Sequence, residues 1–230
     1  MSKIWTVEEL KEVSDALEGK EPQDVLKWVV DNFDTQEFAL ACSFAEIVAL
    51  DMLIKIKPDS RVFYIDTGFL FKETLDVVDK AVKRYGIKVE RYAPKKTKEE
   101  IEKEYGPELW KKDPDRCCEI CKVEPLKEAL TGLKLWISGI RRYQSPTRAN
   151  TPIVEWDERN GLIKVSPLAK WTKKQVWDYI ALHKLPYNAL LDRGYPSIGC
   201  EPCTRPVKPG EDPRSGRWDG FDKTECGLHK

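Results

Sequence analysis

The feature of this sequence that most constrains its fold is the alternation of short apolar runs with longer stretches of helical periodicity. Four apolar runs have the length of strands: 38–42, 62–65, 89–92 and 135–138. Helical patterns at 47–56 and 73–85 separate the first three of them. Near-continuous apolar strands joined by crossover helices are typical of a parallel sheet that is covered on both faces. We therefore expect an α/β fold, with a mainly parallel sheet, helices on both faces, and ligands at the carboxyl ends of the strands.

Further elements are expected toward both ends of the chain. A capping box at Thr6 begins a first amphipathic helix, and Pro22 suits the first position of a second helix. The pair Asn160-Gly161 lies between two apolar runs and suits a hairpin turn, which we expect at the periphery. A helix is expected over 172–183, after which closely spaced prolines and glycines exclude long regular elements.

The balance of charge excludes a strong field over the whole molecule. The chain has 39 Lys and Arg against 39 Asp and Glu, so we expect neither nucleic acid nor a membrane surface as a partner. Residues 1–12 carry no apolar core flanked by positive charge, and no stretch has the ~20 apolar residues that span a bilayer. We expect a cytoplasmic protein, and self-association into a homo-oligomer is left open.

Seven cysteines in a chain without a secretion signal favour metal ligation or thiol chemistry over a disulfide framework. Cys117-Cys118 and the Cys-x-x-Cys pair Cys200 and Cys203 offer four thiolates from two segments. Such a set fits a tetrahedral zinc or a cubane iron–sulfur cluster, and adjacent cysteines favour the larger group. Lys122 projects from the same helical face as Cys118, either as a link between this site and a substrate or as a solvated lysine.

Arginine clusters mark two candidate anion sites. Arg142 lies in a run of three arginines, over 139–148, that directly follows the apolar run at 135–138. Arg214 and Arg217 form a second pair near the C-terminus. Guanidinium groups bind phosphate or sulfate through paired, charge-assisted hydrogen bonds, so both groups are interpreted as anion contacts rather than as surface charge.

Two loops are candidates for nucleotide binding. Ser43 stands between an apolar run and a helix, where its hydroxyl and free amides can meet a phosphate. Asp66, Thr67 and Gly68 follow the next apolar run. Each loop alone is equally well explained as a cap or a turn, whereas the two together at adjacent strand ends favour a ligand site.

A cysteine near the C-terminus is a candidate nucleophile. Cys226 precedes His229, and Lys223 lies close before it. A thiol acts as a nucleophile only as a thiolate, and neighbouring cations lower its pKa. An incidental terminal cysteine is the alternative interpretation.

Taken together, these motifs resemble the assimilatory sulfonucleotide reductases, in the cluster-bearing branch that reduces adenosine 5′-phosphosulfate (APS). The resemblance extends over about 38–229. It is carried by the Cys-Cys and Cys-x-x-Cys set, by Ser-Gly-Ile-Arg-Arg-x-Gln-Ser-x-Thr-Arg over 138–148, and by the terminal Glu-Cys-Gly-Leu-His.

The resemblance implies an adenine-nucleotide α-hydrolase-like fold and a role for each motif. It implies a [4Fe–4S] cluster on Cys117, Cys118, Cys200 and Cys203. Lys122 would bridge cluster and sulfate. Cys226 would attack the sulfate sulfur and expel AMP, and thioredoxin would then release sulfite from Cys226. The activity belongs to sulfate assimilation and cysteine biosynthesis. The remaining matches are the tail histidine His229, the anion contacts Arg142, Arg214 and Arg217, and the nucleotide-loop residues Ser43, Asp66, Thr67 and Gly68.

The resemblance also divides the chain. It implies N-terminal helices at 1–35, a nucleotide-binding α/β domain with the iron–sulfur site at 36–205, and a mobile C-terminal catalytic tail at 206–230. The sequence departs from the family pattern in a loop after Ser43 that is one residue shorter, in Cys121 where many relatives have Arg, and in a longer spacer over 218–224.

Three alternatives remain beside this interpretation. A reductase of the 3′-phosphorylated substrate (PAPS) needs an extra cationic contact for the added phosphate. An ATP pyrophosphatase on a related fold uses a Ser-Gly-Gly-x-Asp type of loop, which 43–47 lacks. A zinc-containing nucleotide-binding protein without catalysis would use the same four cysteines.

Overall fold

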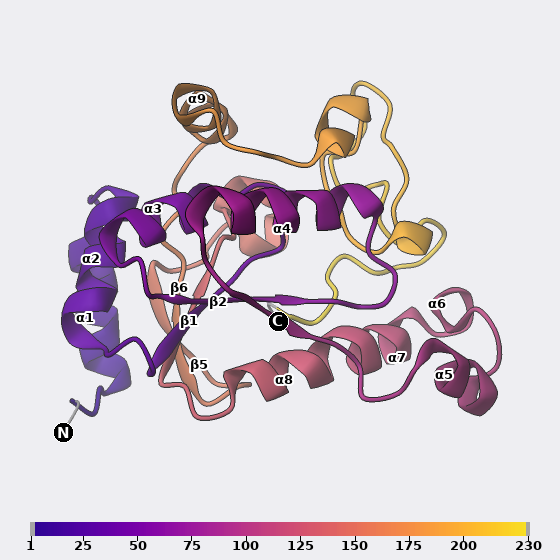
Figure 1. Ribbon diagram of the computed structural model, residues 1–230, viewed down its shortest axis with the longest axis horizontal. Helices are drawn as coiled ribbons and strands as arrows, with labels where there is room; N and C mark the ends of the chain where they lie inside the picture. Colours follow the sequence, from indigo (N-terminus) through magenta and orange to yellow (C-terminus); the bar gives the residue numbers. More distant parts are fainter. Residues whose placement is uncertain (1–2, 229–230) are drawn as a thin grey trace.

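A computed structural model describes residues 3–228, and its centre is a six-stranded sheet of order β3-β2-β1-β4-β6-β5 (Figure 1). The strands are β1 (Phe38–Ala41), β2 (Arg61–Ile65), β3 (Val89–Tyr92), β4 (Leu135–Ser138), β5 (Val154–Asp157) and β6 (Leu162–Val165). All neighbours pair in parallel except β5 and β6. The expected α/β class is therefore confirmed.

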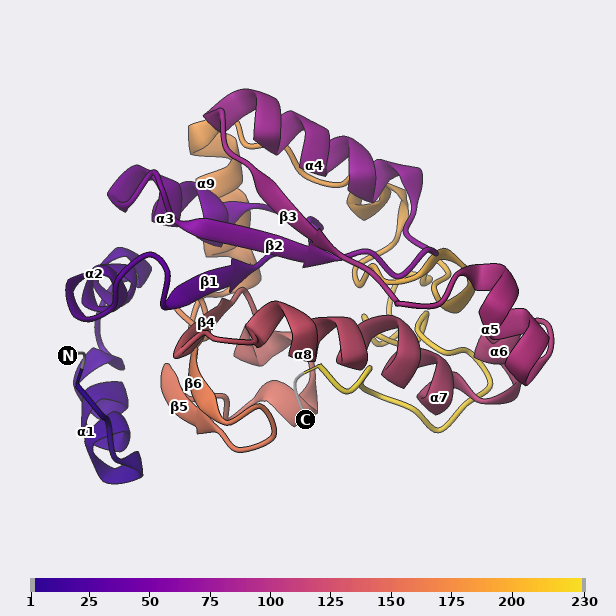
Figure 2. The ribbon, with the colours of Figure 1, turned by 60° about the horizontal axis from the view of Figure 1, so that its bottom comes forward.

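Helices cover both faces of this sheet, as expected. They are α1 (Val7–Leu17), α2 (Pro22–Asn32), α3 (Val48–Ile56), α4 (Lys72–Tyr85), α5 (Lys98–Tyr105), α6 (Leu109–Lys112), α7 (Pro114–Cys118), α8 (Glu124–Leu130) and α9 (Lys173–His183). Figure 2 shows α3 and α4 on one side of the strands and α8 on the other. No helix within 3–228 is long and apolar enough to cross a membrane.

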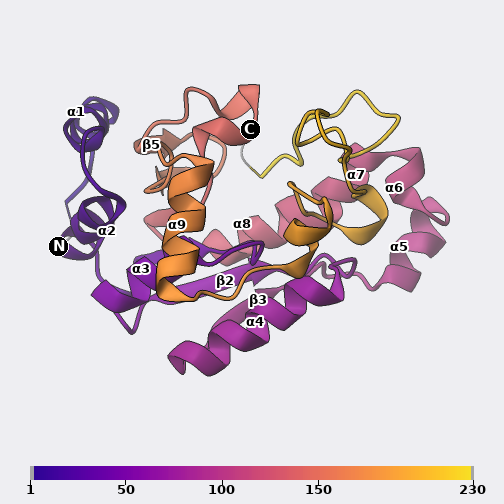
Figure 3. The ribbon, with the colours of Figure 1, turned by 90° about the horizontal axis from the view of Figure 1, so that it is seen from above.

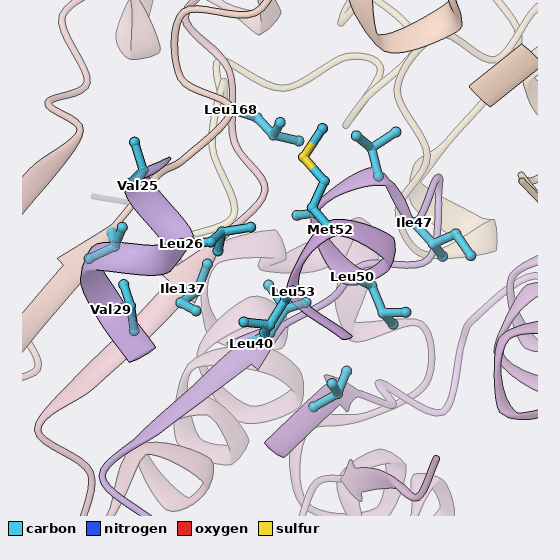
Figure 4. Close-up of a cluster of buried hydrophobic side chains, with 14 of the residues drawn as sticks. Val25, Leu26, Val29, Leu40, Ile47, Leu50, Met52, Leu53, Ile137 and Leu168 are labelled. Carbon is cyan, nitrogen blue, oxygen red and sulfur yellow. The ribbon is translucent and has the colours of Figure 1, made fainter. Parts of the chain in front are cut away.

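Alternate residues of the central strands supply the two cores, because successive side chains of a strand point to opposite faces. On β1, Phe38 and Leu40 join the larger cluster with α2 and α3, whereas Ala39 faces the smaller one. On β4, Trp136 faces that smaller cluster, which α8 covers. Figure 4 shows the larger cluster, where α2, β1 and α3 meet with Leu53 at the centre. This two-sided burial holds the strand ends rigidly.

The N-terminal helices form where the caps predict them. Thr6 and Glu9 make both hydrogen bonds of a capping box on α1, and Pro22 is the first residue of α2. The Ser14 hydroxyl on α1 accepts a hydrogen bond from the backbone N–H of Val154 at 3.1 Å, which attaches α1 to the edge strand β5.

The hairpin around Asn160-Gly161 corrects the sequence-based expectation. Strand β6 is fully buried and pairs in parallel with β4, so it belongs to the main sheet, and only β5 lies at the edge. The hairpin turn itself is confirmed, with Gly161 at φ +69°. The expected peripheral location is therefore confirmed for β5 and wrong for β6, because β6 pairs in parallel with β4 and extends the main sheet.

The remaining segments gather at the carboxyl end of the sheet. In Figure 3, α5, α6, α7 and the segment after α9 lie at the opposite end of the molecule from α1 and α2. Within 184–228 the regular elements are short 3₁₀ turns, as the prolines and glycines predict. The chain leaves β1 toward β2 on one side and returns to β4 on the other, so a crevice is expected at the carboxyl ends of β1 and β4.

Candidate active site

The loops after β1 and β4 lie next to each other at the carboxyl end of the sheet, where the topology predicts a crevice. Ser43 is exposed directly after β1, and the buried Phe44 holds a left-handed conformation at φ +54°. Glu46 at the end of the same loop forms a buried ion pair with Arg141, which follows β4. The second Glu46 oxygen accepts a hydrogen bond from the backbone N–H of Val48 at 2.6 Å. The two strand-end loops are therefore tied together.

The loop after β2 reaches the cysteines. The Asp66 carboxylate accepts a hydrogen bond from the backbone N–H of Gly68 at 3.0 Å and pairs with Arg91 at 2.6 Å. The buried Thr67 hydroxyl lies 3.3 Å from the Cys200 sulfur. A predicted nucleotide loop and a predicted ligand cysteine are thus in direct contact.

The four cysteines predicted as ligands line one pocket. Its walls are Phe69, Trp110, Pro114, Cys117, Cys118, Cys121, Lys122, Cys200, Pro202 and Cys203. All of these cysteines are free thiols. The π-helical segment Glu119–Val123 joins α7 to α8. Such π-bulges are common at functional sites. The helix therefore carries three thiols, those of Cys117, Cys118 and Cys121, and one cation into the pocket, which the segment around Cys200 closes.

The donor set is four thiols from two segments around one pocket. A tetrahedral zinc needs every sulfur about 2.3 Å from a common point, whereas a [4Fe–4S] cluster takes one thiolate at each of four irons and is wider. Within 3–228, no three Cys, His, Asp or Glu side chains converge as the ligands of one metal ion would. The residues present supply the thiolate chemistry that either group uses.

Lys122 is buried beside the cysteines, with 6% of its surface exposed. Its Nζ lies 3.8 Å from the sulfur of Cys118, as the helical spacing predicts. Burial alone would lower the pKa of the Lys122 ammonium, but the nearby sulfurs of Cys200, Cys226 and Cys118 outweigh it and raise that pKa. Lys122 therefore remains a cation at neutral pH.

A second group of cations surrounds the buried ring of Trp218. The Arg217 guanidinium lies 4.5 Å from the ring centroid, and Lys122, Lys223 and Arg214 lie 5.5–5.9 Å from it. The negative face of an indole ring attracts cations. Trp218 therefore offsets part of the mutual repulsion of these cations and keeps them together.

Small residues allow this arrangement. The Ser197 hydroxyl accepts hydrogen bonds from Arg217 at 3.2 Å and from Arg214 at 3.5 Å. A Cβ placed on Gly199 would lie 2.1 Å from Nη2 of Arg217. Only glycine at position 199 therefore lets this guanidinium lie against the backbone.

Three buried donors in this group have no hydrogen-bond partner within the described residues: Nε of Arg214, Nε of Arg217 and Nε1 of Trp218. Buried polar atoms are almost always hydrogen-bonded, because leaving one unpaired costs about 1–3 kcal/mol. Two of these donors belong to cations. The group therefore fits an anionic ligand.

Cys226 is half-buried beside the same cations. Burial opposes ionisation of this thiol, but Lys122, a backbone hydrogen bond from Leu228 and Arg217 together outweigh it and lower the pKa of Cys226. Cys42, which is part of the core, differs, since burial raises the pKa of its thiol to about 12. The thiol that the sequence singled out as a nucleophile is the one favoured as a thiolate.

One predicted site residue, Arg142, lies apart from this group. Arg142 makes a two-pronged ion pair with Glu18, at 2.6 and 2.9 Å, and donates to the Thr151 carbonyl at 2.9 Å. The structure does not bring its guanidinium to the cysteines or to Trp218, because Glu18 at the end of α1 holds it. His229 lies outside the described residues.

Sequence reasoning missed several residues of the site. Trp218 stands only within the spacer over 218–224 and Glu225 only within the terminal motif, and the sequence pattern assigns neither a role. Arg148, the last arginine of the run after β4, pairs with that carboxylate at 2.7 Å. An aromatic residue next to an arginine pair and a glutamate beside a candidate nucleophile are the sequence signals that point to them.

Comparison with known proteins identifies a family and several close relatives of this chain. The model of the phosphoadenosine phosphosulfate reductase domain matches residues 37–206. A protein named adenosine 5′-phosphosulfate reductase from Halalkalibacterium halodurans is 46% identical over 224 residues, covering 96% of each chain. Another protein of that name, from Geobacillus thermodenitrificans, is 49% identical over 92% of this chain and 91% of its own.

Solved structures agree with the fold. A phosphoadenylyl-sulfate (PAPS) reductase from Candida auris, in a phosphate complex, superposes with a TM-score of 0.79 at 34% identity and covers 89% of this chain and all of its own. An FMN adenylyltransferase from Candida glabrata, at 14% identity, has a TM-score of 0.59 over 90% of this chain and 69% of its own. The second likeness shows a shared fold alone.

Proposed function

The chain belongs to the phosphoadenosine phosphosulfate reductase family, and we propose that it is a cytoplasmic oxidoreductase that reduces APS to sulfite and AMP with thioredoxin as the reductant. APS is preferred over PAPS because curated relatives that are 45–49% identical to this chain are named adenosine 5′-phosphosulfate reductase. This reaction supplies sulfite to sulfate assimilation and cysteine biosynthesis.

The observation that carries the proposal is a nucleophilic thiol inside a buried cationic group. Cys226 has a lowered pKa, and Arg214 and Arg217 beside it retain unpartnered donors. A sulfate ester presents negatively charged oxygens around an electrophilic sulfur. Cations that neutralise these oxygens and a thiolate aimed at the sulfur are what its reduction requires.

In the first step, the Cys226 thiolate attacks the sulfur of the sulfate group. A bond forms between the two sulfur atoms, and the bond from sulfur to the bridging phosphate oxygen breaks. AMP leaves with that electron pair, and Cys226 becomes an S-sulfonate. Lys122, Arg214 and Arg217 hold the negative oxygens while this charge moves.

In the second step, a thioredoxin thiolate attacks the Cys226 sulfur. Sulfite leaves with the electron pair of the sulfur–sulfur bond, and a mixed disulfide forms between the two proteins. The second thioredoxin thiol breaks this disulfide, which restores the Cys226 thiol and leaves thioredoxin oxidised. The dithiol thereby supplies both electrons that reduce the sulfate sulfur.

A [4Fe–4S] cluster is proposed as the cofactor, held by Cys117, Cys118, Cys200 and Cys203. When bound, it supplies a charged, polarisable centre next to Lys122 and needs to carry no electrons, since the dithiol provides them. Lys122 links this site to the substrate, because its ammonium lies within the electrostatic reach of Cys118, Cys200 and Cys226.

The nucleotide half of the substrate is assigned to the strand-end loops. Ser43 after β1 and Asp66, Thr67 and Gly68 after β2 surround the crevice at the carboxyl ends of the strands. Arg142 is proposed as an anion contact by family position, although it pairs with Glu18 here. His229 is proposed as the tail histidine that assists Cys226.

Sulfite release tests the proposal. Anaerobically purified enzyme with thioredoxin is expected to release sulfite from APS much faster than from PAPS, and Cys226→Ser is expected to release none. Cys42→Ser, which removes a core thiol, is the matched control and should keep the activity. A higher rate with PAPS would make PAPS, and not APS, the substrate. A colourless purified protein that contains zinc but no iron would exclude the cluster.

A further inference from the structure

Glu225, which immediately precedes the nucleophile, is the one buried residue within 219–228. Only 4% of its surface is exposed, and its carboxylate is surrounded by donors from the loop after β4 and from the tail itself. On the basis of the proposed function, we propose that Glu225 is a positioning residue for Cys226. Its carboxylate fastens the tail over the site so that Cys226 is presented to the substrate, and it releases the tail before thioredoxin reaches the S-sulfonate.

Five hydrogen bonds build this contact, which we call the Glu225 latch: Glu225 with Ser145, Thr147, Arg148 and Arg214. Oε1 accepts from Nε of Arg148 at 2.9 Å, from the Thr147 hydroxyl at 3.0 Å and from the Ser145 hydroxyl at 3.2 Å. Oε2 accepts from Nη2 of Arg148 at 2.7 Å and from Nη2 of Arg214 at 3.2 Å. Arg148 thus grips both oxygens with a planar fork, the strongest geometry of a guanidinium–carboxylate pair.

The latch is an attachment of this part of the tail in which both partners are largely buried. The buried Lys223 side chain pairs instead with the exposed Asp115, and Arg159 donates to the Gly227 carbonyl at the surface. Leu228 packs on the smaller apolar cluster but is only half-buried. A buried carboxylate is stable only while it is paired. We therefore expect the five hydrogen bonds of the latch to form together and to break together.

Closing the latch places the thiol. Glu225 and Cys226 share a peptide bond, so a fixed Glu225 leaves the Cys226 sulfur little freedom beside Lys122 and Arg217. Arg214 contributes to both groups, with Nη2 on Glu225 and Nη1 on Ser197 in the cation group around Trp218. Binding of the sulfate to that cation group and closing of the tail therefore involve a common guanidinium.

The second half-reaction requires the opposite state. A thioredoxin thiolate must approach the Cys226 sulfur in line with the sulfur–sulfur bond. In the latched tail this thiol is half-buried, within the electrostatic reach of Lys122 and Arg217. A protein-sized reductant reaches it only after the tail lifts, so the latch assists formation of the S-sulfonate and opposes its discharge.

The test is Glu225→Gln, which keeps the shape of the side chain and removes its charge, with Asp222→Asn on the exposed tail as the matched control. Hydrogen exchange of the amides at 221–228 in the cluster-loaded enzyme without substrate is measured first, because it does not depend on the charge of Cys226. We expect exchange about tenfold faster or more in Glu225→Gln, and no change in the control.

Single-turnover kinetics then separate the two half-reactions. Glu225→Gln is expected to form the S-sulfonate from APS about tenfold more slowly or worse, whereas thioredoxin discharges the preformed S-sulfonate at least as fast as from the wild type. Wild-type rates for both steps, or equal slowing of both, would overturn the proposal. If the wild type forms no S-sulfonate, the proposed function fails, while the exchange measurement still tests the latch.

Arg148→Gln gives a second test should Glu225→Gln fold poorly. Because Arg148 holds both carboxylate oxygens, its loss is expected to accelerate exchange at 221–228 as much as Glu225→Gln does. The double variant is expected to add little, since each change breaks the same latch. Additive effects would show that the two residues act separately and would overturn the proposal.

Discussion

The sheet and the C-terminal segment at 191–228 are held together by different forces. The sheet is buried on both faces by aliphatic and aromatic side chains, with Leu53, Leu40 and Trp136 almost fully inaccessible. Figure 4 shows Leu53 and Leu40 in the larger cluster. In the C-terminal segment only Cys200, Gly216, Trp218 and Glu225 are buried. Its attachments are ion pairs, cation–π contacts and thiols. The fold of the sheet is therefore expected to be independent of ligands, whereas the order of the segment depends on what occupies the site.

This difference matches the division of labour that we propose. A nucleotide needs a fixed crevice, which the strand ends provide. A thiol that meets first a small substrate and then a protein must move, and segments that move are those with few buried apolar contacts. The following changes are ordered from the largest expected effect to the smallest.

Leu53→Ala is expected to destabilise the sheet and only the sheet. Leu53 is fully buried at the centre of the larger core, and truncation of a buried leucine costs about 2–5 kcal/mol. Denaturant unfolding should show this loss, while Cys226 reactivity at low denaturant stays as in the wild type. A tail that loosens to the same extent as the sheet would break the distinction between the two regions.

Cys203→Ser should act on the other region. Loss of one ligand is expected to remove the cluster. Because binding of a cofactor stabilises the segments that hold it, amide exchange over 191–228 is then expected to become about a hundredfold faster. The exchange of β1 and β4 should change little. Iron content and exchange mass spectrometry measure both effects, and equal acceleration in the strands would contradict the comparison.

Gly199→Ala tests the arginine group without touching a charge. The new Cβ would lie 2.1 Å from Nη2 of Arg217, so the guanidinium must move. We expect the KM for APS to rise about tenfold, as for the loss of one charge-assisted hydrogen bond, with the melting temperature almost unchanged. Gly19→Ala, where an added Cβ meets no atom within 4 Å, is the control. An unchanged KM would show that the position of Arg217 is unimportant.

Arg142→Gln is expected to have the smallest effect. Its pair with Glu18 is partly exposed, and such pairs contribute about 0–1 kcal/mol. Glu18→Gln should lower the stability equally and leave the KM for APS within about twofold of the wild type, whereas Arg142→Gln should also raise that KM modestly, because the proposed anion contact is lost with the guanidinium. A large rise of KM in Arg142→Gln alone would mean that this side chain leaves Glu18 to bind substrate.

The part of the molecule that the sequence predicts well is the part with a repeating pattern. The positions of the central strands and of the crossover helices follow from apolar periodicity, and the contact of Lys122 with Cys118 follows from helical spacing. The ion pair of Arg142 with Glu18 could not be predicted from the sequence, because the two residues lie 124 positions apart and no local pattern relates them. The same holds for Glu225 and Arg148, 77 positions apart. The role of Gly199 depends on a close approach that only three-dimensional coordinates show.

The most direct test of the account is the intact mass of the enzyme after APS is added without thioredoxin. We expect the wild-type protein to gain the mass of one SO₃ group and to release an equal amount of AMP. Peptide mapping is expected to locate the added group on Cys226. Cys226→Ser, with its iron retained, should gain nothing. An adduct that persists on Cys226→Ser, or cluster-loaded wild-type enzyme that releases AMP without any adduct, would contradict the assignment of the covalent chemistry to the tail.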